Sequence, residues 1–386
     1  MDPKEDPMKQ KKYEHTILLL QGGGALGAYQ AGAYEGLAEA GILPDWIVGV
    51  SIGSINGTII AGNPPERRVE RLREFWDRMS SYSAMYPPAW FHGMRSSLCR
   101  MSAATVATFG IQGFFTPRLI PPVFALDGNP GALSIYNTEP LRTTLEELVD
   151  FDLINRRDVR LSLGAANVQT GDSHYFDNHS TRIGPDHTRA SGALPPSFPP
   201  VEIEGEYFWD GGIVSNSPIW YVSEQSPNIN ALIVQVDLFS ARGELPENLD
   251  DVQERAKDIQ YSSKTRFSLS KMREQNNMRT ALGRVLAKLP PDLKNDPDVL
   301  KLAPLCKDRQ LTLAHLINRR RSNATYMKDY EFSRQTINEG WQAGLEDVRL
   351  SVANKEWLVP TDLGFGMKVY YLPPTTSASP VEKTHE

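Results

Sequence analysis

Cysteine is scarce in this chain of 386 residues, which has only Cys99 and Cys306. Two cysteines cannot build a disulfide framework or a zinc site made of cysteines alone, and their scarcity fits a reducing compartment. An excess of basic charge is also missing, because 41 lysines and arginines face 47 aspartates and glutamates, for a formal charge of −6. That balance lacks the electrostatic footprint of a nucleic-acid-binding protein, so we expect no nucleic-acid partner.

The chain also has no apolar run suited to crossing a membrane. The uncharged stretch 46–65 contains four glycines and five Ser, Thr or Asn residues and ends in Pro-Pro, so it is too polar and too broken to span a bilayer. The apolar segment 16–20 is too short for the core of a signal peptide. We therefore expect a cytoplasmic protein, with peripheral contact at a membrane left open.

Acidic residues are missing from residues 78–126, where 47 acids in 386 residues would place about six. The same stretch contains four basic residues and several aromatic ones: Trp90, Phe91, Phe109, Phe114 and Phe115. Two interpretations stay open. One is a lid or acyl-chain pocket that touches lipid, and the other is an apolar segment that packs over the core.

Apolar periodicity predicts an α/β fold with a mainly parallel central sheet between helices. Two strand-glycine-helix units come first, with strands at 15–20 and 45–50 and helices at 25–40 and after residue 51. Further strands are predicted at 160–168, 173–178, 231–239 and 310–317, the first two of these as a hairpin, and further helices at 66–80, 252–289 and 328–352.

The texture of the chain changes along its length and predicts its domains. Residues 1–12 are a charged tail, 13–245 form the α/β domain, 246–372 form a mostly helical extension, and 373–386 are a polar tail. Residues 255–288 contain nine basic and two acidic residues. This segment predicts either a helix that binds a membrane surface or a partner, or a solvated helix face.

The first glycine cluster, Gly22-Gly23-Gly24-Ala25-Leu26-Gly27, matches the pattern G-x-G-x-x-G between a strand and a helix. Such a loop can hold a dinucleotide pyrophosphate, but that use wants an acidic residue at the end of the next strand, where Ser51 stands. The same backbone N–H groups at a helix N-terminus can hold a tetrahedral oxyanion. A tight turn without a ligand is the third interpretation.

A second glycine motif, Gly49-Val50-Ser51-Ile52-Gly53, also lies between a strand and a helix. Glycines at Gly49 and Gly53 leave room for a sharp turn that exposes the Ser51 hydroxyl, as in a nucleophile elbow. The ordinary alternative is a serine that fills a tight turn.

A serine nucleophile needs a base, and the sequence offers two kinds. Downstream histidines are His174, His179, His187 and His315, none in a recognisable catalytic setting. Asp210 follows the aromatic run Tyr207-Phe208-Trp209 and precedes two glycines, so partial desolvation would raise its pKa and improve it as a base. An Asp-Gly turn is the structural alternative.

The clustered histidines do not predict a metal site. His174 and His179 differ in strand parity and would point to opposite faces, and no cysteine or carboxylate pair completes a ligand spacing.

Together these motifs resemble one family, the patatin-like phospholipases. The resemblance rests on residues 22–32, 49–56 and 210–212, with similar flanks at 190–195, 198–200 and 216–218, and covers about residues 13–240. It implies a three-layer sandwich and a Ser–Asp dyad without histidine, in which Ser51 is the nucleophile and Asp210 the general base. It also implies an oxyanion hole at Gly22, Gly23 and Gly24, and acyl-ester hydrolysis on lipids with no metal or cofactor. Many members carry Arg or Lys where Leu26 stands, so no basic side chain is expected there.

The sequence thus predicts a serine lipid acyl hydrolase, of phospholipase A or lysophospholipase type, that acts on a lipid or another acyl ester. Two alternatives stay open: a dinucleotide-dependent oxidoreductase that uses the first glycine loop, and a non-catalytic lipid-binding module. Headgroup, chain length and oligomeric state are not predicted.

Overall fold

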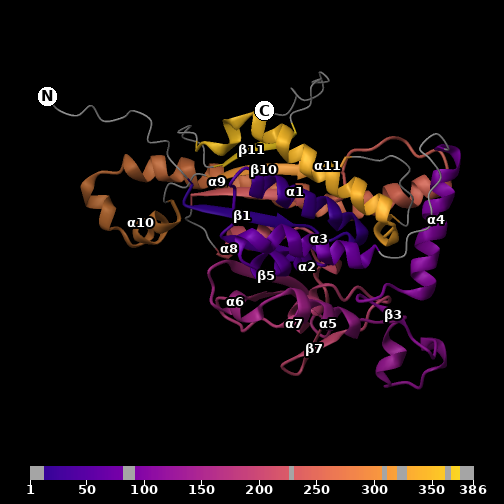
Figure 1. The fold of residues 1–386 in the computed structure, drawn as a ribbon. Helices are drawn as coiled ribbons and strands as arrows, with labels where there is room; N and C mark the ends of the chain where they lie inside the picture. The colour runs from indigo at the N-terminus through magenta and orange to yellow at the C-terminus, as the bar shows by residue number, and fades with distance from the viewer. Residues whose placement is uncertain are drawn as a thin grey trace.

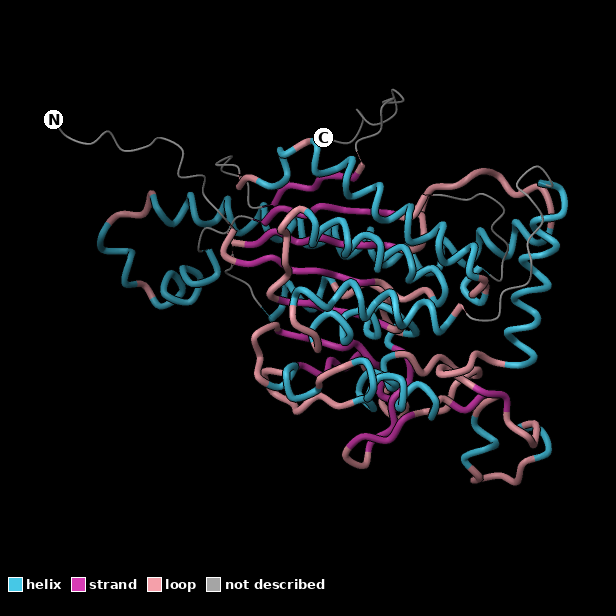
Figure 2. Tube along the Cα trace, viewed as in Figure 1, coloured by secondary structure: helices cyan, strands magenta, loops and turns pink. Residues whose placement is uncertain are grey.

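A computed structural model describes residues 13–80, 92–225, 230–306, 311–319, 328–360 and 367–373. The predicted tails at 1–12 and 374–386, together with Trp90 and Phe91, lie outside these residues. A nine-stranded sheet runs through the molecule, and its main part has the order β11-β10-β9-β1-β2-β5 (Figure 1, Figure 2). These six strands are parallel, which confirms the predicted fold class. Their bounds are β1 (His15–Leu20), β2 (Trp46–Val50), β5 (Arg160–Asn167), β9 (Ala231–Asp237), β10 (Leu311–Ile317) and β11 (Met367–Leu372).

Both faces of the sheet are covered, so β1 and β2 are apolar at successive positions rather than at alternate ones. Leu18, Leu20 and Ile47 belong to the larger core cluster, on the face covered by α1, α2, α3 and α11. Ile17, Leu19 and Val48 belong to a smaller cluster on the opposite face, covered by α8 and α9. The result is three layers, helix-sheet-helix. The bounds of these helices are α1 (Gly27–Glu39), α2 (Ile52–Ala61), α3 (Arg68–Met79), α8 (Ile219–Gln225), α9 (Leu249–Ala287) and α11 (Arg334–Ala353).

α1 and α11 pack at very short range, although more than 290 residues separate them in the chain (Figure 1). An ideal Cβ at Gly32 of α1 would overlap the carbonyl oxygen of Trp341 in α11. Glycine at this position is therefore required by the close approach of the two helices rather than by a turn.

Beyond β5 the sheet becomes antiparallel. β6 (Ser173–Asp177) forms the predicted hairpin with β5, while β8 (Glu206–Asp210) pairs with β5 and with β7 (Val201–Ile203). β6 and β8 pair with overlapping residues of β5, so they lie on its two opposite sides. β8 consequently continues the side of β5 that β2 occupies up to Val50.

The C-terminal extension is mostly helical, but it also continues the sheet. β10, predicted at 310–317, pairs with β9, and β11, which the periodicity does not predict, pairs with β10. The predicted helix 328–352 is wrong at its start, because Lys328–Tyr330 form a separate short 3-10 turn (η8) and Ser333 caps α11 from the next segment. The predicted boundary at residue 245 falls between β9 and α9, within one continuous sheet.

The remaining elements surround this framework. They are α4 (His92–Phe109), β3 (Thr116–Pro117), β4 (Tyr136–Asn137), α5 (Glu139–Leu148), α6 (Phe151–Asn155), α7 (Pro185–Ser191) and α10 (Pro297–Leu302). Across the described ranges, every helix is too short or too polar to cross a bilayer.

Candidate active site

Ser51 lies in the connection between β2 and α2, in a backbone conformation that residues with a side chain rarely adopt. Its φ is 57° and its ψ is −125°, a strained combination that costs on the order of 1–3 kcal/mol. An ideal Cβ at Gly53 would overlap the carbonyl oxygen of Leu20, so only glycine lets the first turn of α2 pack this closely against β1. The motif 49–53 therefore has the geometry of a nucleophile elbow.

Ser191, at the end of α7, holds this elbow in place. The Ser51 N–H donates to both the carbonyl oxygen and the hydroxyl of Ser191, at 3.1 and 3.2 Å. The Ser191 hydroxyl in turn donates to the Gly164 carbonyl of β5 at 2.5 Å and lies 2.6 Å from the Ser54 hydroxyl. Sequence reasoning noted Ser191 only as part of a similar flank and missed this supporting role, because the contact joins segments 140 residues apart.

Asp210, the last residue of β8, is brought next to Ser51 by strand pairing. Val50 pairs with Gly164 of β5, and Asp210 pairs with the next residue of β5, Ala165, on the same side. The Asp210 side chain is buried and accepts a hydrogen bond of 2.7 Å from the Gly212 N–H.

Burial raises the pKa of Asp210 to about 6, although hydrogen bonds from the Ser51 side chain and the Gly212 backbone act to lower it. A carboxylate with this pKa is ionised at neutral pH and is still basic enough to accept a proton.

The glycine loop that follows β1 faces the same place, but its three amides are not equivalent. The Gly22 N–H donates to the Asn216 side chain at 3.1 Å, and the Asn216 amide donates back to the Gly22 carbonyl at 3.0 Å. For the described residues no acceptor is recorded for the N–H groups of Gly23 and Gly24, which precede α1. Gly24 has a positive φ of 56°, which glycine adopts without strain. These two amides are the donors left for a ligand.

Ser51, Asp210 and the glycine loop line one narrow cavity of about 70 Å³. The apolar part of its wall is large and consists of Ile52, Ile55, Phe114, Phe115, Leu194, Phe198, Phe239 and Phe332. The C-terminal extension adds Tyr261 from α9, Asp329 and Tyr330 from η8, and Phe332. Histidine, lysine and arginine do not contribute to this wall among the described residues.

Comparison with known families decides the relationship of this chain. A model of the patatin-like phospholipases matches residues 18–223, and a second model, described as patatin phospholipase, matches residues 259–363. The chain belongs to the patatin-like phospholipase family. A comparison with curated proteins found no match. Among solved structures, VipD from Legionella pneumophila shares 14% identity over 89% of this chain and 68% of its own, with a TM-score of 0.37.

The two matched regions of this patatin-like phospholipase meet at the cavity. The first supplies Ser51, Asp210 and the glycine loop, and the second supplies Tyr261, Tyr330 and Phe332. Membership of the family makes the protein a lipid hydrolase in general terms.

One expectation for the acid-free stretch of this patatin-like phospholipase is wrong for two residues. Phe114 and Phe115 are not exposed lid aromatics, because they are buried against Tyr136, Phe198 and Phe332 and form part of the cavity wall. An apolar segment that follows them directly is what the stretch exposes instead, at residues 118–135.

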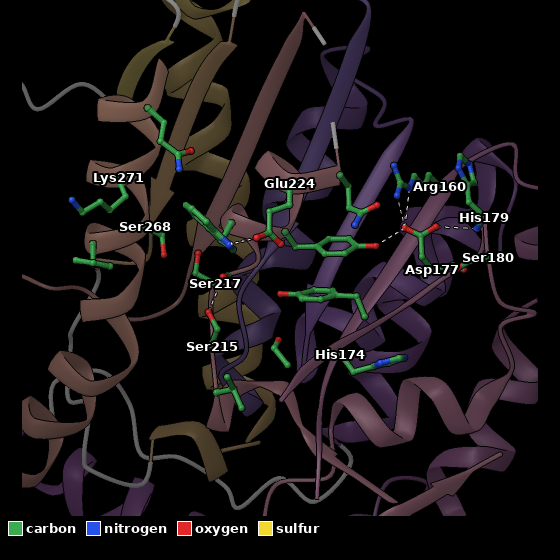
Figure 3. Close-up of a pocket in the computed structure, with 18 residues that line it drawn as sticks. Arg160, His174, Asp177, His179, Ser180, Ser215, Ser217, Glu224, Ser268 and Lys271 are labelled. Carbon is green, nitrogen blue, oxygen red and sulfur yellow. Dashed lines mark hydrogen bonds and ion pairs between the residues drawn. The ribbon is translucent and has the colours of Figure 1, made fainter. Parts of the chain in front are cut away.

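The four histidines considered as bases lie away from the cavity. His315 is buried and pairs with Asp237 at 2.8 Å, and His187 accepts a hydrogen bond from the Gly184 N–H at the start of α7. His174 and His179 both line a second groove (Figure 3). Within the described ranges, no group of three His, Cys, Asp or Glu residues could hold a metal ion.

The second groove is much larger, about 1190 Å³, and lies between β6, α8 and α9 (Figure 3). Its wall contains the stacked rings of Tyr175 and Tyr221 and the ion pair of Asp177 with Arg160. Neither Ser51 nor Asp210 lines it. The larger opening is therefore separate from the cavity of the predicted dyad.

Proposed function

We propose that this protein is a serine lipid acyl hydrolase, of phospholipase A or lysophospholipase type, that works through a Ser51–Asp210 dyad and an acyl-enzyme. The observation that carries the proposal is the meeting of the strained Ser51, the buried Asp210 and two free glycine amides in one cavity whose wall contains no histidine. The adjoining aromatic and aliphatic wall offers an apolar surface for an acyl chain.

In the first half-reaction, the Ser51 hydroxyl oxygen attacks the ester carbonyl carbon while its proton passes to Asp210. The carbonyl oxygen becomes an oxyanion that the N–H groups of Gly23 and Gly24 stabilise, together with the positive end of α1. The bond from carbon to the alcohol oxygen then breaks, and the alcohol leaves with the proton from Asp210. The acyl group remains on Ser51.

In the second half-reaction, a water molecule attacks the acyl carbon and gives a proton to Asp210. The bond from carbon to the Ser51 oxygen breaks, the proton returns to that oxygen, and the fatty acid leaves. Asp210 acts as base in each addition step and as acid in each departure step. This alternation suits a carboxylate whose pKa lies close to neutral.

The role of Gly22 in this proposal differs from that of its two neighbours. Its amide is already engaged by Asn216, so we assign Gly22 to holding the loop and Gly23 and Gly24 to the oxyanion. Asn216 and Ser191 are positioning residues, because they contact the loop and the elbow rather than the reacting atoms.

The decisive test is covalent labelling with a fluorophosphonate, followed by peptide mapping. We expect the label on Ser51, and we expect Ser51→Ala to abolish both labelling and ester hydrolysis. Ser173→Ala, which alters the second groove, is the matched control and should leave both unchanged. Labelling that persists in Ser51→Ala would move the nucleophile elsewhere. Lipid binding without labelling or turnover in the unaltered protein would instead favour the non-catalytic lipid-binding module.

A further inference from the structure

An apolar finger, residues 118–135, projects from the body of the molecule next to β3 (Figure 1, Figure 2). It leaves at β3 and returns at β4, and these two short strands pair antiparallel to form its stem. The Arg118 N–H donates to the Ile135 carbonyl, and the Arg118 guanidinium donates to the Ser134 hydroxyl at 2.9 Å. The finger thus has a defined base, and short 3-10 turns at Pro122–Phe124 and Pro130–Leu133 shape the rest of it.

The finger carries large apolar side chains that point into solvent. Leu119 is 102% exposed, Val123 83%, Leu126 81% and Phe124 77%. Ile120, Leu133 and Ile135 are also exposed, and Arg118 and Asp127 are the only charged residues of the finger. Single exposed apolar residues are ordinary on protein surfaces, but a concentration of seven in 18 residues marks an interaction site.

The base of the finger is tied to the wall of the catalytic cavity. Phe114 and Phe115 line the cavity and precede β3 directly. At the returning end, Tyr136 packs its ring on Phe115 and Phe198, and its N–H donates to the Ser197 carbonyl. A ligand held by the finger would therefore lie beside the cavity that contains Ser51.

The shape and charge of the finger favour a lipid surface over a protein as its occupant. Its apolar side chains stand out separately on a projecting segment, whereas a protein partner needs a closely matched surface to bury them. Fluid acyl chains accept such side chains without a matched shape. The chain from residue 78 to residue 126 has no carboxylate, so anionic headgroups meet little repulsion there.

We propose that the apolar finger inserts into the surface of a bilayer or lipid aggregate and holds the catalytic cavity over it. This inference rests on the proposed function, since it takes the substrate to be a lipid. Arg118 at the stem lies at headgroup depth in this arrangement, with Leu119, Val123, Phe124 and Leu126 in the acyl region.

The test is cosedimentation with vesicles of phosphatidylcholine and of phosphatidylcholine with 20% phosphatidylglycerol. Every protein carries Ser51→Ala, so that hydrolysis does not alter the vesicles. The triple variant Val123→Ser, Phe124→Ser, Leu126→Ser should bind both kinds of vesicle at least tenfold more weakly. Its melting temperature should not change, because these side chains have no packing to lose.

The matched control is Leu293→Ser, Leu300→Ser, Leu305→Ser. These side chains are 45–58% exposed and lie in the α10 region, on the far side of the molecule from the finger (Figure 1). The control should bind vesicles as the parent does. Equal binding by the finger variant and the parent would overturn the proposal, and so would equal loss in the finger variant and the control.

Two further readouts separate this inference from its alternatives. Light scattering after size exclusion should give the same mass for the parent and the finger variant. A dimer that only the variant loses, with vesicle binding unchanged, would assign the finger to self-association and overturn the proposal. In proteins with Ser51 intact, the finger variant should lose at least tenfold in hydrolysis of vesicle lipid but not of a soluble short-chain ester. Hydrolysis that survives Ser51→Ala would refute the proposed function while leaving the vesicle-binding result valid.

Discussion

At the scale of single residues, Asp210 combines two properties that oppose each other. Its burial beside an aromatic strand raises its pKa to about 6, which makes it a stronger base than an exposed aspartate. The same burial destabilises the folded protein whenever Asp210 is ionised, because a buried charge is poorly solvated. The residue is therefore expected to serve catalysis at the expense of stability.

Asp210→Asn should abolish hydrolysis and raise stability at neutral pH. In the wild type, the folded pKa of about 6 exceeds the unfolded value of 3.8, so stability falls as pH rises from about 4 to 6. Above that window the loss is roughly 2–3 kcal/mol, from about 1.4 kcal/mol for each pKa unit. Asn has no charge to bury and can still accept the Gly212 N–H. Thermal melts at pH 4 and pH 8 should show a gain for the variant at pH 8 only.

The pH dependence of the wild-type reaction tests the same residue independently. We expect kcat/KM to rise with pH through an apparent pKa near 6, as Asp210 loses its proton, and then to level off. Histidine titrates in the same range, so His174→Ala, His179→Ala, His187→Ala and His315→Ala serve as controls. Each should keep the profile and lose less than about tenfold in rate, whereas a general base contributes about 10²–10⁴-fold. One histidine variant as inactive as Ser51→Ala would refute the dyad.

At the scale of elements, the site depends on two loops that are held from outside. The elbow between β2 and α2 is held by Ser191, and the loop between β1 and α1 is held by Asn216. Both supports lie in the second half of the catalytic segment, on either side of Asp210. Strand β8 and its flanks therefore deliver the base and both supports together.

Asn216→Ala should reduce stability and turnover together. It leaves the buried N–H and carbonyl of Gly22 without partners, at a cost of roughly 1–3 kcal/mol for each group. The Gly23 and Gly24 amides would then lose their alignment, so kcat should fall more than KM rises. Asn63→Ala is the matched control, because Asn63 also makes two buried hydrogen bonds to backbone, at Ile59 and Leu148, away from the cavity. It should lower the melting temperature but preserve kcat at 20 °C. A control that loses as much kcat as Asn216→Ala would show that general loosening, and not the loop, limits the rate.

At the scale of the whole molecule, the C-terminal extension completes the catalytic body. β10 covers the edge of β9, and α11 buries Trp341 and Val348 against α1. Lys328 forms ion pairs with Glu254 and Asp258 of α9, at 3.1 and 2.6 Å, and these hold η8 beside the cavity. The extension therefore contributes to the sheet, to the core and to the site.

A chain truncated after residue 245 should fail to fold. Truncation exposes the edge of β9 and the α1 surface that Trp341 and Val348 cover, and it removes Tyr261, Tyr330 and Phe332 from the cavity wall. A chain truncated after residue 373 keeps every described strand and is the control. Circular dichroism and size exclusion should give a folded monodisperse species for the longer chain only. A folded, active 13–245 fragment would show that the extension is dispensable.

Much of the local structure is predictable because short-range patterns determine it. The apolar runs that end in glycine clusters predict β1 and β2, and the glycines around Ser51 predict a tight turn that only small residues permit. Alternating apolar and polar residues do not mark β11, which lies at the sheet edge and is only partly buried, so its pattern is weak. Family motifs place Ser51 and Asp210 in one site before any coordinates are known.

Only the tertiary structure decides how those residues are arranged and supported. The neighbourhood of Ser51 and Asp210 depends on β2 and β8 pairing along the same side of β5, which no local pattern encodes. The same is true of the engagement of the Gly22 amide by Asn216 across 194 residues, and of the burial of Phe114 and Phe115 next to an exposed finger of similar composition. Composition measures how apolar a segment is, whereas exposure depends on what the rest of the chain places against it. For this protein the sequence by itself determined the elements and the reactive residues, and the packing of distant segments decided which amides, carboxylates and apolar side chains remain free to act.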